Sequence, residues 1–261
     1  MDSSAKKTLF SMIQSSVDTL PPEDTFLLEL RQTVQKCNPP QKGSTYYKPS
    51  SMNCNRLMYF MAKDTEPDDT LPSYSSVRIT ESGTSSHEKI QYYVSQMRNK
   101  GFDCDWISPE WYVKNKGLDY LVIRDKKEFE TKFLDTRYNL SFLCDGIIRY
   151  KGNYYILEIK TETDYKNMNR KDADSKHKNQ ATCYSLSLGI NDVMWIYESR
   201  NLCNPQVFHT SVSDKDREDI VMKIEYVDDC VKNNIVPPKT DMLNTCQYCD
   251  YRGTCSKIIS K

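Results

Sequence analysis

The chain has 261 residues, enough to bury a substantial core, and we expect one large domain. Its 36 Lys and Arg residues balance its 36 Asp and Glu residues, so any contact with nucleic acid must come from a local patch of charge. Apolar runs do not approach the roughly 20 residues of a membrane span, and the first residues lack the apolar core of a secretion signal. These features exclude a membrane protein and predict a cytoplasmic one.

The N-terminal part of the chain has the apolar spacing of helices at residues 5–16 and 23–37. Proline pairs follow the two segments, at Pro21-Pro22 and Pro39-Pro40. We assign residues 1–49 to a helical extension and residues 50–261 to the main domain. The extension either packs against the core or serves to bind a partner or cap DNA.

Residues 50–61 predict a further helix, which begins with a capping type of residue and carries Cys54. A single cysteine in such a place is ordinarily a small core residue, and this stretch alone does not make it a ligand. The acidic, proline-containing segment 64–72 predicts an exposed loop.

A helix is predicted after Gly83, with His87 in its first turn and apolar residues at helical spacing behind it. The positive end of a helix dipole disfavours a protonated imidazole, which leaves a ring nitrogen free to bind metal. The alternative is a surface or capping histidine. Residues 106–113 then suggest a strand, with Glu110 as an exposed carboxylate or a further acidic site residue.

Residues 140–162 predict a β-hairpin around which the rest of the chain is organised. Residues 140–150 and 154–160 are rich in Ile, Leu, Phe and Tyr, and Lys151-Gly152-Asn153 between them is typical of a turn. A two-residue loop at Lys151-Gly152 would place Asp145 opposite Glu158, whereas a loop at Gly152-Asn153 would place it opposite Lys160.

Either register gathers two carboxylates and an ammonium group from Asp145, Glu158 and Lys160. Facing carboxylates repel each other and call for a cation, and carboxylate oxygens are ligands that Mg²⁺ or Mn²⁺ prefers. The alternative is an exposed strand face with an ordinary ion pair across it.

Residues 161–179 are polar and rich in Lys and Arg, which is typical of a solvated loop or, beside a phosphodiesterase site, of a guide for a nucleic-acid strand. Residues 179–189 predict a helix with Gln180 and Tyr184 on one face and Gly189 as its C-cap. This pair either contacts a phosphate or the nearby lysine, or packs with its polar tips toward solvent. A buried strand at 192–197 and an amphipathic helix at 214–233 follow.

The last part of the chain presents Cys246, Cys249 and Cys255 as C-x2-C-x5-C, three of ten cysteines in all. Thiols so closely spaced in a polar, tyrosine-containing tail indicate a shared soft metal, because no export signal supports disulfides. The tail supplies no fourth ligand, so one must return from far away in the chain. Uncommitted or disulfide-forming thiols are the alternative.

Together these motifs resemble the RecB-type branch of the PD-(D/E)xK nucleases, and within it the iron-sulfur exonucleases that include CRISPR-adaptation nucleases and their phage-borne relatives. The resemblance covers residues 54–255 and follows the family's order of motifs. The matching positions, from first to last, are Cys54, His87, Asp145, Glu158-Ile159-Lys160, Gln180, Tyr184, Cys246, Cys249 and Cys255. The chain departs from the family pattern in having Cys144, not proline, before Asp145, and residues 1–50 match nothing in it.

The resemblance implies an α/β fold, a mixed β-sheet flanked by helices. It also implies a structural [4Fe-4S] cluster on Cys54, Cys246, Cys249 and Cys255, which would close a loop of about 190 residues. A Cys-ligated Zn²⁺ is the alternative at that site.

For activity, the resemblance implies a DNA exonuclease acting on single strands or DNA ends. His87, Asp145, Glu158 and the backbone carbonyl of Ile159 would hold Mg²⁺ or Mn²⁺, Lys160 would activate water, and Gln180 and Tyr184 would position the strand or the lysine. Recombination or CRISPR-adaptation proteins are the partners that it suggests. A DNA-binding or assembly protein that keeps the fold without catalysis is the alternative; the oligomeric state is not predicted.

Overall fold

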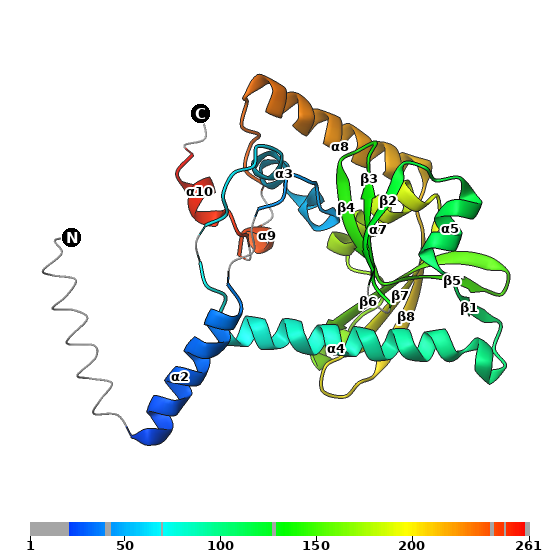
Figure 1. Cartoon of the computed structure of the whole chain (residues 1–261), viewed down its shortest axis with the longest axis horizontal. Helices are drawn as coiled ribbons and strands as arrows, with labels where there is room; N and C mark the ends of the chain where they lie inside the picture. The colour runs from blue at the N-terminus through cyan, green and yellow to red at the C-terminus, as the bar shows by residue number, and fades with distance from the viewer. Residues whose placement is uncertain are drawn as a thin grey trace, which may run out of the picture. The chain divides into compact units, whose positions relative to one another are not determined.

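The computed structural model describes residues 21–39, 43–68, 70–126, 129–240, 243–247 and 249–258, which form an α/β fold of two β-sheets flanked by helices (Figure 1). Its residues divide into two compact units, 21–39 with 70–81 and 43–68 with 82–258. The expected boundary at residue 49 stays a prediction. Within the larger unit, the isolated bridge from Tyr47 to Leu140 already belongs to the buried core.

The larger sheet has five strands in the order β1-β5-β6-β7-β8. Its strands are β1 (Cys104–Trp106), β5 (Gly146–Tyr150), β6 (Asn153–Glu162), β7 (Asp192–Ser199) and β8 (Pro205–Ser211). Only β6 and β7 run parallel, so the chain between them must cross over the sheet, and it does so through α6 (Asp164–Met168) and α7 (Ser175–Leu188). The sheet is therefore mixed, as predicted, and the expected strand at 192–197 is confirmed within β7.

The smaller sheet holds β2 (Leu121–Lys126), β3 (Thr131–Asp135) and β4 (Leu140–Cys144), all antiparallel. The continuous strand predicted for residues 140–150 is therefore wrong. The chain pairs with β3 up to Cys144, bends at Asp145, and pairs with β6 from Gly146 onward. Asp145 is the point at which the chain passes from one sheet to the other.

The β5–β6 hairpin adopts the first of the two expected registers. Lys151 and Gly152 both have positive φ, 48° and 84°, as a two-residue loop with the twist of the flanking strands requires. Tyr150 pairs with Asn153, and the ladder continues to Gly146 opposite Leu157. One step further, Asp145 faces Glu158.

The two faces of the five-stranded sheet pack against different helices. Ile156 belongs to the large core that α7 and α8 (Asp214–Asn233) cover, together with Trp195 of β7. Leu157 and Ile159 point to the opposite face, against the second half of α4 (Tyr74–Gln96). Because side chains alternate along a strand, Glu158 and Lys160 lie on the same face as Ile156.

Several helices agree with the sequence and others differ. The helix predicted at 23–37 is α2 (Pro22–Cys37). The helix predicted at 5–16 lies outside the described part of the chain. The helix α8 has the predicted bounds, and Ile220, Ile224 and Val227 are buried as expected. The single helix predicted at 50–61 is η1 (Pro49–Asn53) followed by α3 (Asn55–Ala62), and Cys54 lies between the two.

The strand predicted at 106–113 is wrong. Only Trp106 belongs to a strand; Ser108 caps α5 (Pro109–Lys116) and accepts a hydrogen bond from Trp111 N. Proline at the first helical position favours this start. Glu110 lies in the first turn of α5, where a carboxylate complements the helix dipole.

The remaining short helices are α9 (Leu243–Gln247), α10 (Arg252–Ser256) and η2 (Arg98–Lys100). Of the described helices, none is long and apolar enough to cross a membrane.

Candidate active site

Asp145 is fixed from two directions at the bend between the sheets. Its carboxylate Oδ2 accepts a hydrogen bond of 2.7 Å from Ile159 N on β6, and its backbone carbonyl accepts one of 2.7 Å from Gln91 Nε2 on α4. The side chain thus takes the place of the next acceptor in the β5–β6 ladder. With only 8% of Asp145 exposed, the carboxylate is held in one position before any ligand binds.

Glu158 and Lys160 form a buried ion pair on β6. Lys160 Nζ lies 2.6 Å from Glu158 Oε1, and the same nitrogen donates a hydrogen bond of 3.1 Å to Gln180 Oε1 on α7. Gln180 Nε2 donates in turn to the Tyr184 hydroxyl at 2.5 Å. The predicted pair on α7 therefore reaches the lysine, and Gly189 caps that helix with a φ of 67° as expected.

His87 joins the cluster from α4, although not from the predicted position. The helix begins at Tyr74, so His87 lies in its middle, and the expected effect of the helix N-terminus on its ring is wrong. Its Nδ1 instead lies 3.5 Å from Asp145 Oδ1. Burial alone would lower the pKa of His87, but the hydrogen bond and charge of Asp145 outweigh burial and raise it.

The electrostatics of the cluster are dominated by burial of charge. Burial, assisted by Asp145, raises the pKa of Glu158 to about 7 against the opposing charge of Lys160. Burial would lower the pKa of Lys160, but the charges of Glu158 and Asp145 raise it overall. The second oxygen of Glu158, Oε2, is buried and has no hydrogen-bond partner. A buried carboxylate oxygen without a partner is costly unless a cation or ligand satisfies it.

The candidate ligands suit a metal ion that is held only partly by protein side chains. In the described ranges, no three His, Cys, Asp or Glu side chains are gathered closely enough to hold an ion by themselves. Mg²⁺ is ordinarily held by one or two protein carboxylates, with waters and substrate phosphates completing its shell. Asp145 and the unpartnered oxygen of Glu158 fit that arrangement.

The four cysteines singled out in the sequence, Cys54 and the distant group of Cys246, Cys249 and Cys255, line one cavity of about 440 Å³. Burial raises the pKa of the Cys249 thiol, and the charges of the neighbouring cysteines act in the same direction. Arg56 is 3% exposed, donates to Pro237 O at 2.8 Å, and places its Nη1 3.5 Å from Cys255 Sγ. A buried guanidinium beside a thiol suits a site that carries negative charge.

Asp68 fixes the helix that carries Cys255. Its carboxylate accepts hydrogen bonds from Gly253 N and, at 3.0 Å and 2.8 Å, from the Thr254 nitrogen and hydroxyl. These bonds lower the pKa of Asp68. The predicted loop at 64–72 therefore has a specific role, which its acidic composition did not reveal.

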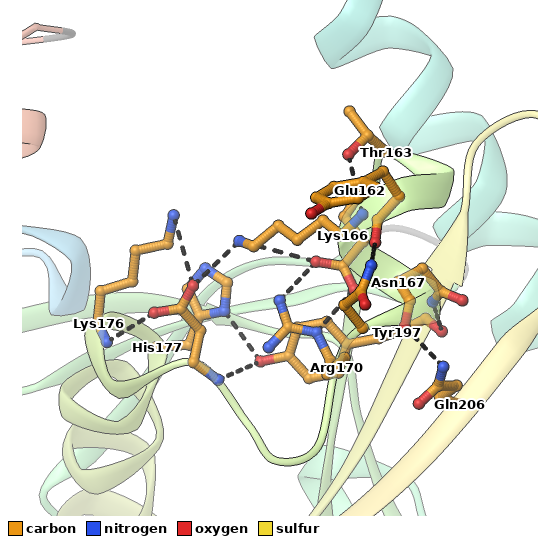
Figure 2. A network of polar contacts seen from close by, with 12 residues as sticks. Glu162, Thr163, Lys166, Asn167, Arg170, Lys176, His177, Tyr197 and Gln206 are labelled. Carbon is orange, nitrogen blue, oxygen red and sulfur yellow. Dashed lines mark hydrogen bonds and ion pairs between the residues drawn. The ribbon is translucent and has the colours of Figure 1, made fainter.

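The basic segment after β6 is largely neutralised by carboxylates of the chain itself (Figure 2). Arg170 contacts Glu162 at 2.5 Å and lies 3.9 Å over the Tyr197 ring. Lys166 Nζ lies 3.1 Å from Asp174. These contacts favour a structural network over the predicted guide for a nucleic-acid strand.

Sequence patterns missed three members of the site and its surroundings. Gln91 lies one helical turn after His87, a spacing that places both on one helix face, and this signal was available. Tyr197 and His177 share a hydrogen bond of 3.0 Å between the hydroxyl and Nδ1, yet they come from different elements, and no local pattern links them.

No protein-family model matches the chain, and no curated protein matches it. Among solved structures it is similar to SSO0001, with a TM-score of 0.47 and 12% identity over 92% of this chain and 99% of that one. It is also similar to LHK-Exo in complex with dAMP, with a TM-score of 0.45 and 9% identity over 82% of this chain and 95% of that one. A second structure, that of the alkaline exonuclease LHK-Exo from Laribacter hongkongensis, has a TM-score of 0.39 and 7% identity over 78% of this chain and 94% of that one. At TM-scores below 0.5, these likenesses establish neither family nor activity.

Proposed function

We propose that this chain is a metal-dependent nuclease whose catalytic residues are Asp145, Glu158 and Lys160. The observation that carries the proposal is the buried Oε2 of Glu158, which has no hydrogen-bond partner, although the other oxygen of this carboxylate pairs with Lys160 and the charge of Asp145 acts on it. An exposed strand face with an ordinary ion pair would leave no such oxygen, because water would satisfy it. A divalent cation would bind this oxygen and would also balance the negative charges of Asp145 and Glu158.

Asp145, Glu158 and the backbone carbonyl of Ile159 would hold Mg²⁺ or Mn²⁺, with His87 as a further ligand. Within a strand, the N–H and C=O of one residue point toward the same neighbour, so the Ile159 carbonyl faces the side from which Asp145 accepts its bond. When bound, such an ion lowers the pKa of a water molecule and stabilises negative charge on phosphate oxygens.

The remaining residues of the site would orient the attacking water and neutralise charge on the phosphate. Lys160 is kept cationic by its carboxylate neighbours and would orient the attacking water or neutralise charge on the scissile phosphate. Gln180 accepts from Lys160 and donates to Tyr184, so it fixes the direction of the ammonium group. Burial of Tyr184 raises its pKa, which keeps the hydroxyl protonated. This chain of bonds holds the lysine in place without a ligand.

We further propose that the substrate is DNA, single-stranded or with free ends, and that cleavage proceeds as an exonuclease. Support for DNA comes only from the order of motifs in the sequence. On the same basis, the pathway would be recombination, repair, replication or CRISPR-related processing.

For the cysteine cavity we propose a structural [4Fe-4S] cluster on Cys54, Cys246, Cys249 and Cys255. All four cysteines line the same cavity of about 440 Å³, with the buried Arg56 beside Cys255, which supports a single shared centre. A Cys-ligated Zn²⁺ is the alternative at the same cavity. Visible absorbance with iron and zinc analysis of anaerobically purified protein tests this, and a colourless, zinc-loaded sample would reject it.

The decisive experiment is digestion of end-labelled single- and double-stranded DNA with Mg²⁺, Mn²⁺ or a chelator. Asp145→Asn and Glu158→Gln should lower the cleavage rate by about a thousandfold or more, because each removes a proposed metal ligand. Asp192→Asn is the matched control and should cleave normally, because Asp192, at the start of β7, pairs with His209 of β8 and not with the site residues. Chelator-resistant cleavage, or full activity in both variants, would refute the proposal. DNA binding without cleavage by the unaltered protein would favour a non-catalytic binding protein.

A further inference from the structure

A second hollow of about 470 Å³ lies on α4, beside the candidate active site. It is lined by three aromatic rings, by two acidic side chains and one lysine, and by Gln91. These residues are Tyr92, Tyr93, Phe129, Glu88, Glu130, Lys89 and Gln91. None of the motifs found in the sequence includes them.

Gln91 connects the hollow to the backbone of Asp145. Its Nε2 donates to the backbone carbonyl of Asp145, while its Oε1 is buried and unpartnered. Gln91 has no exposed surface of its own, so this acceptor is not satisfied by bulk water. A ligand that offers an N–H group would satisfy it.

The rings of the hollow are accessible to a ligand. Tyr92 is 50% exposed and Tyr93 is 68% exposed, and their ring centroids lie 5.6 Å apart in an edge-to-face arrangement. Phe129 is held from behind by Trp106, with centroids 5.6 Å apart. Exposed rings of this kind are stacking surfaces for planar groups.

The charge of the lining indicates which part of a nucleic acid fits. Among the described residues, the lining has one cation, Lys89, beside the carboxylates of Glu88 and Glu130, so it offers no cluster of cations for a phosphate. An uncharged aromatic base with an amino group would stack on the rings and donate to the free oxygen of Gln91. The backbone of the same strand would then pass on the Asp145 side.

We propose that this hollow is a nucleobase-binding subsite, which holds one unpaired base of the strand whose phosphodiester bond is cleaved at Asp145. The proposal rests on the proposed nuclease function and deepens it, because a base can enter the hollow only when it is unstacked and unpaired. The substrate class is therefore single-stranded DNA or a frayed end.

The test is a scan of end-labelled single-stranded oligonucleotides, each with one abasic residue at a different position. With the unaltered protein and Mg²⁺ or Mn²⁺, one abasic position near the scissile bond should slow cleavage by about tenfold, the value expected for loss of one stacked base. Tyr92→Ala should slow cleavage of the intact strand by a similar factor and remove the sensitivity at that position. Tyr92→Phe keeps the ring and should keep the sensitivity.

Tyr226→Ala is the matched control, because Tyr226 is also a half-exposed tyrosine on a helix, α8, and does not line the hollow. It should leave both the rate and the abasic profile unchanged. If the unaltered protein cleaves but Tyr92→Ala and Phe129→Ala both retain its abasic profile, the subsite is refuted and the nuclease function stands. If the unaltered protein neither cleaves nor binds DNA, both proposals fall.

Discussion

The candidate active site and the cysteine cavity are organised in opposite ways. In the active site, hydrogen bonds and ion pairs link Asp145, Glu158, Lys160 and Gln180 to strands and helices that are close in the sequence. In the cavity, Cys54 meets Cys246, Cys249 and Cys255 from the other end of the described chain. The first site is built by the sheet, whereas the second brings together segments far apart in the sequence.

The largest expected effect is a loss of stability at the cysteine cavity that has no counterpart at the active site. Cys54→Ser should remove the proposed cluster and lower the free energy of unfolding by about 4 kcal/mol, because the link closes a very long loop. Asp145→Asn, in contrast, should abolish cleavage with little loss of stability. Denaturant unfolding with metal analysis measures both effects. Cys203→Ser, at an exposed cysteine, is the control, and equal losses from Cys54→Ser and Cys203→Ser would contradict this expectation.

A smaller effect tests how tightly the sheet builds the active site. A Cβ added to Gly146, next to Asp145, would lie 2.5 Å from the Trp106 ring. Gly146→Ala should therefore cost about 1–3 kcal/mol and slow cleavage by displacing Asp145.

Trp106→Leu provides the space that the added methyl group needs. Within that background, Gly146→Ala should cost much less, and the difference is measured by a double-mutant cycle of unfolding free energies. Additive costs would show that contact with the ring is not the cause.

The smallest expected effect is a change in how stability depends on pH below 6.5. Burial, aided by the charge of Lys160, lowers the pKa of His177 from 6.5 to about 3, so the folded chain keeps the ring neutral while the unfolded chain protonates it. The stabilisation is complete above pH 6.5 and is lost progressively as the pH falls toward 3.

Replacing His177 with glutamine removes this titration. Between pH 6.5 and 5, the variant should lose about 1 kcal/mol less stability than the unaltered protein, after allowance for partial exposure of the ring. Parallel unfolding curves across this interval would contradict the expectation. Replacing His209, which is half exposed, serves as the control.

The hairpin and the helices α7 and α8 could be predicted because each depends on a local sequence pattern. The turn at residues 151–153 limited the hairpin to two registers, of which the structure has the one with Tyr150 opposite Asn153. Both registers brought Asp145 to Glu158 or Lys160, so the convergence of these residues could be predicted. The amphipathic spacing of α8 and the glycine after α7 were equally direct. Short periods and turn residues act within a few positions, and a single sequence displays them.

The parts that could not be predicted depend on partners distant in the chain. The hairpin pairing of β5 with β6 was expected, but nothing near Asp145 indicates that β4 leaves that sheet to pair with β3, because the residues on both sides of Asp145 are largely apolar. The early start of α4 was hidden by its serines and threonines, which are weak helix formers that tertiary packing overrides. The pairing of Arg170 with Glu162 likewise needed the fold, since the sequence shows only a basic segment.

The bend at Asp145 makes this residue a joint between two sheets. Its own backbone is outside both ladders, and its carbonyl is held by Gln91 of α4. α4 therefore holds the backbone of this residue, while β6 holds its carboxylate through Ile159 N. The position of the carboxylate thus depends on two elements at once, and a substitution at Gln91 removes the helix's hydrogen bond without touching either sheet.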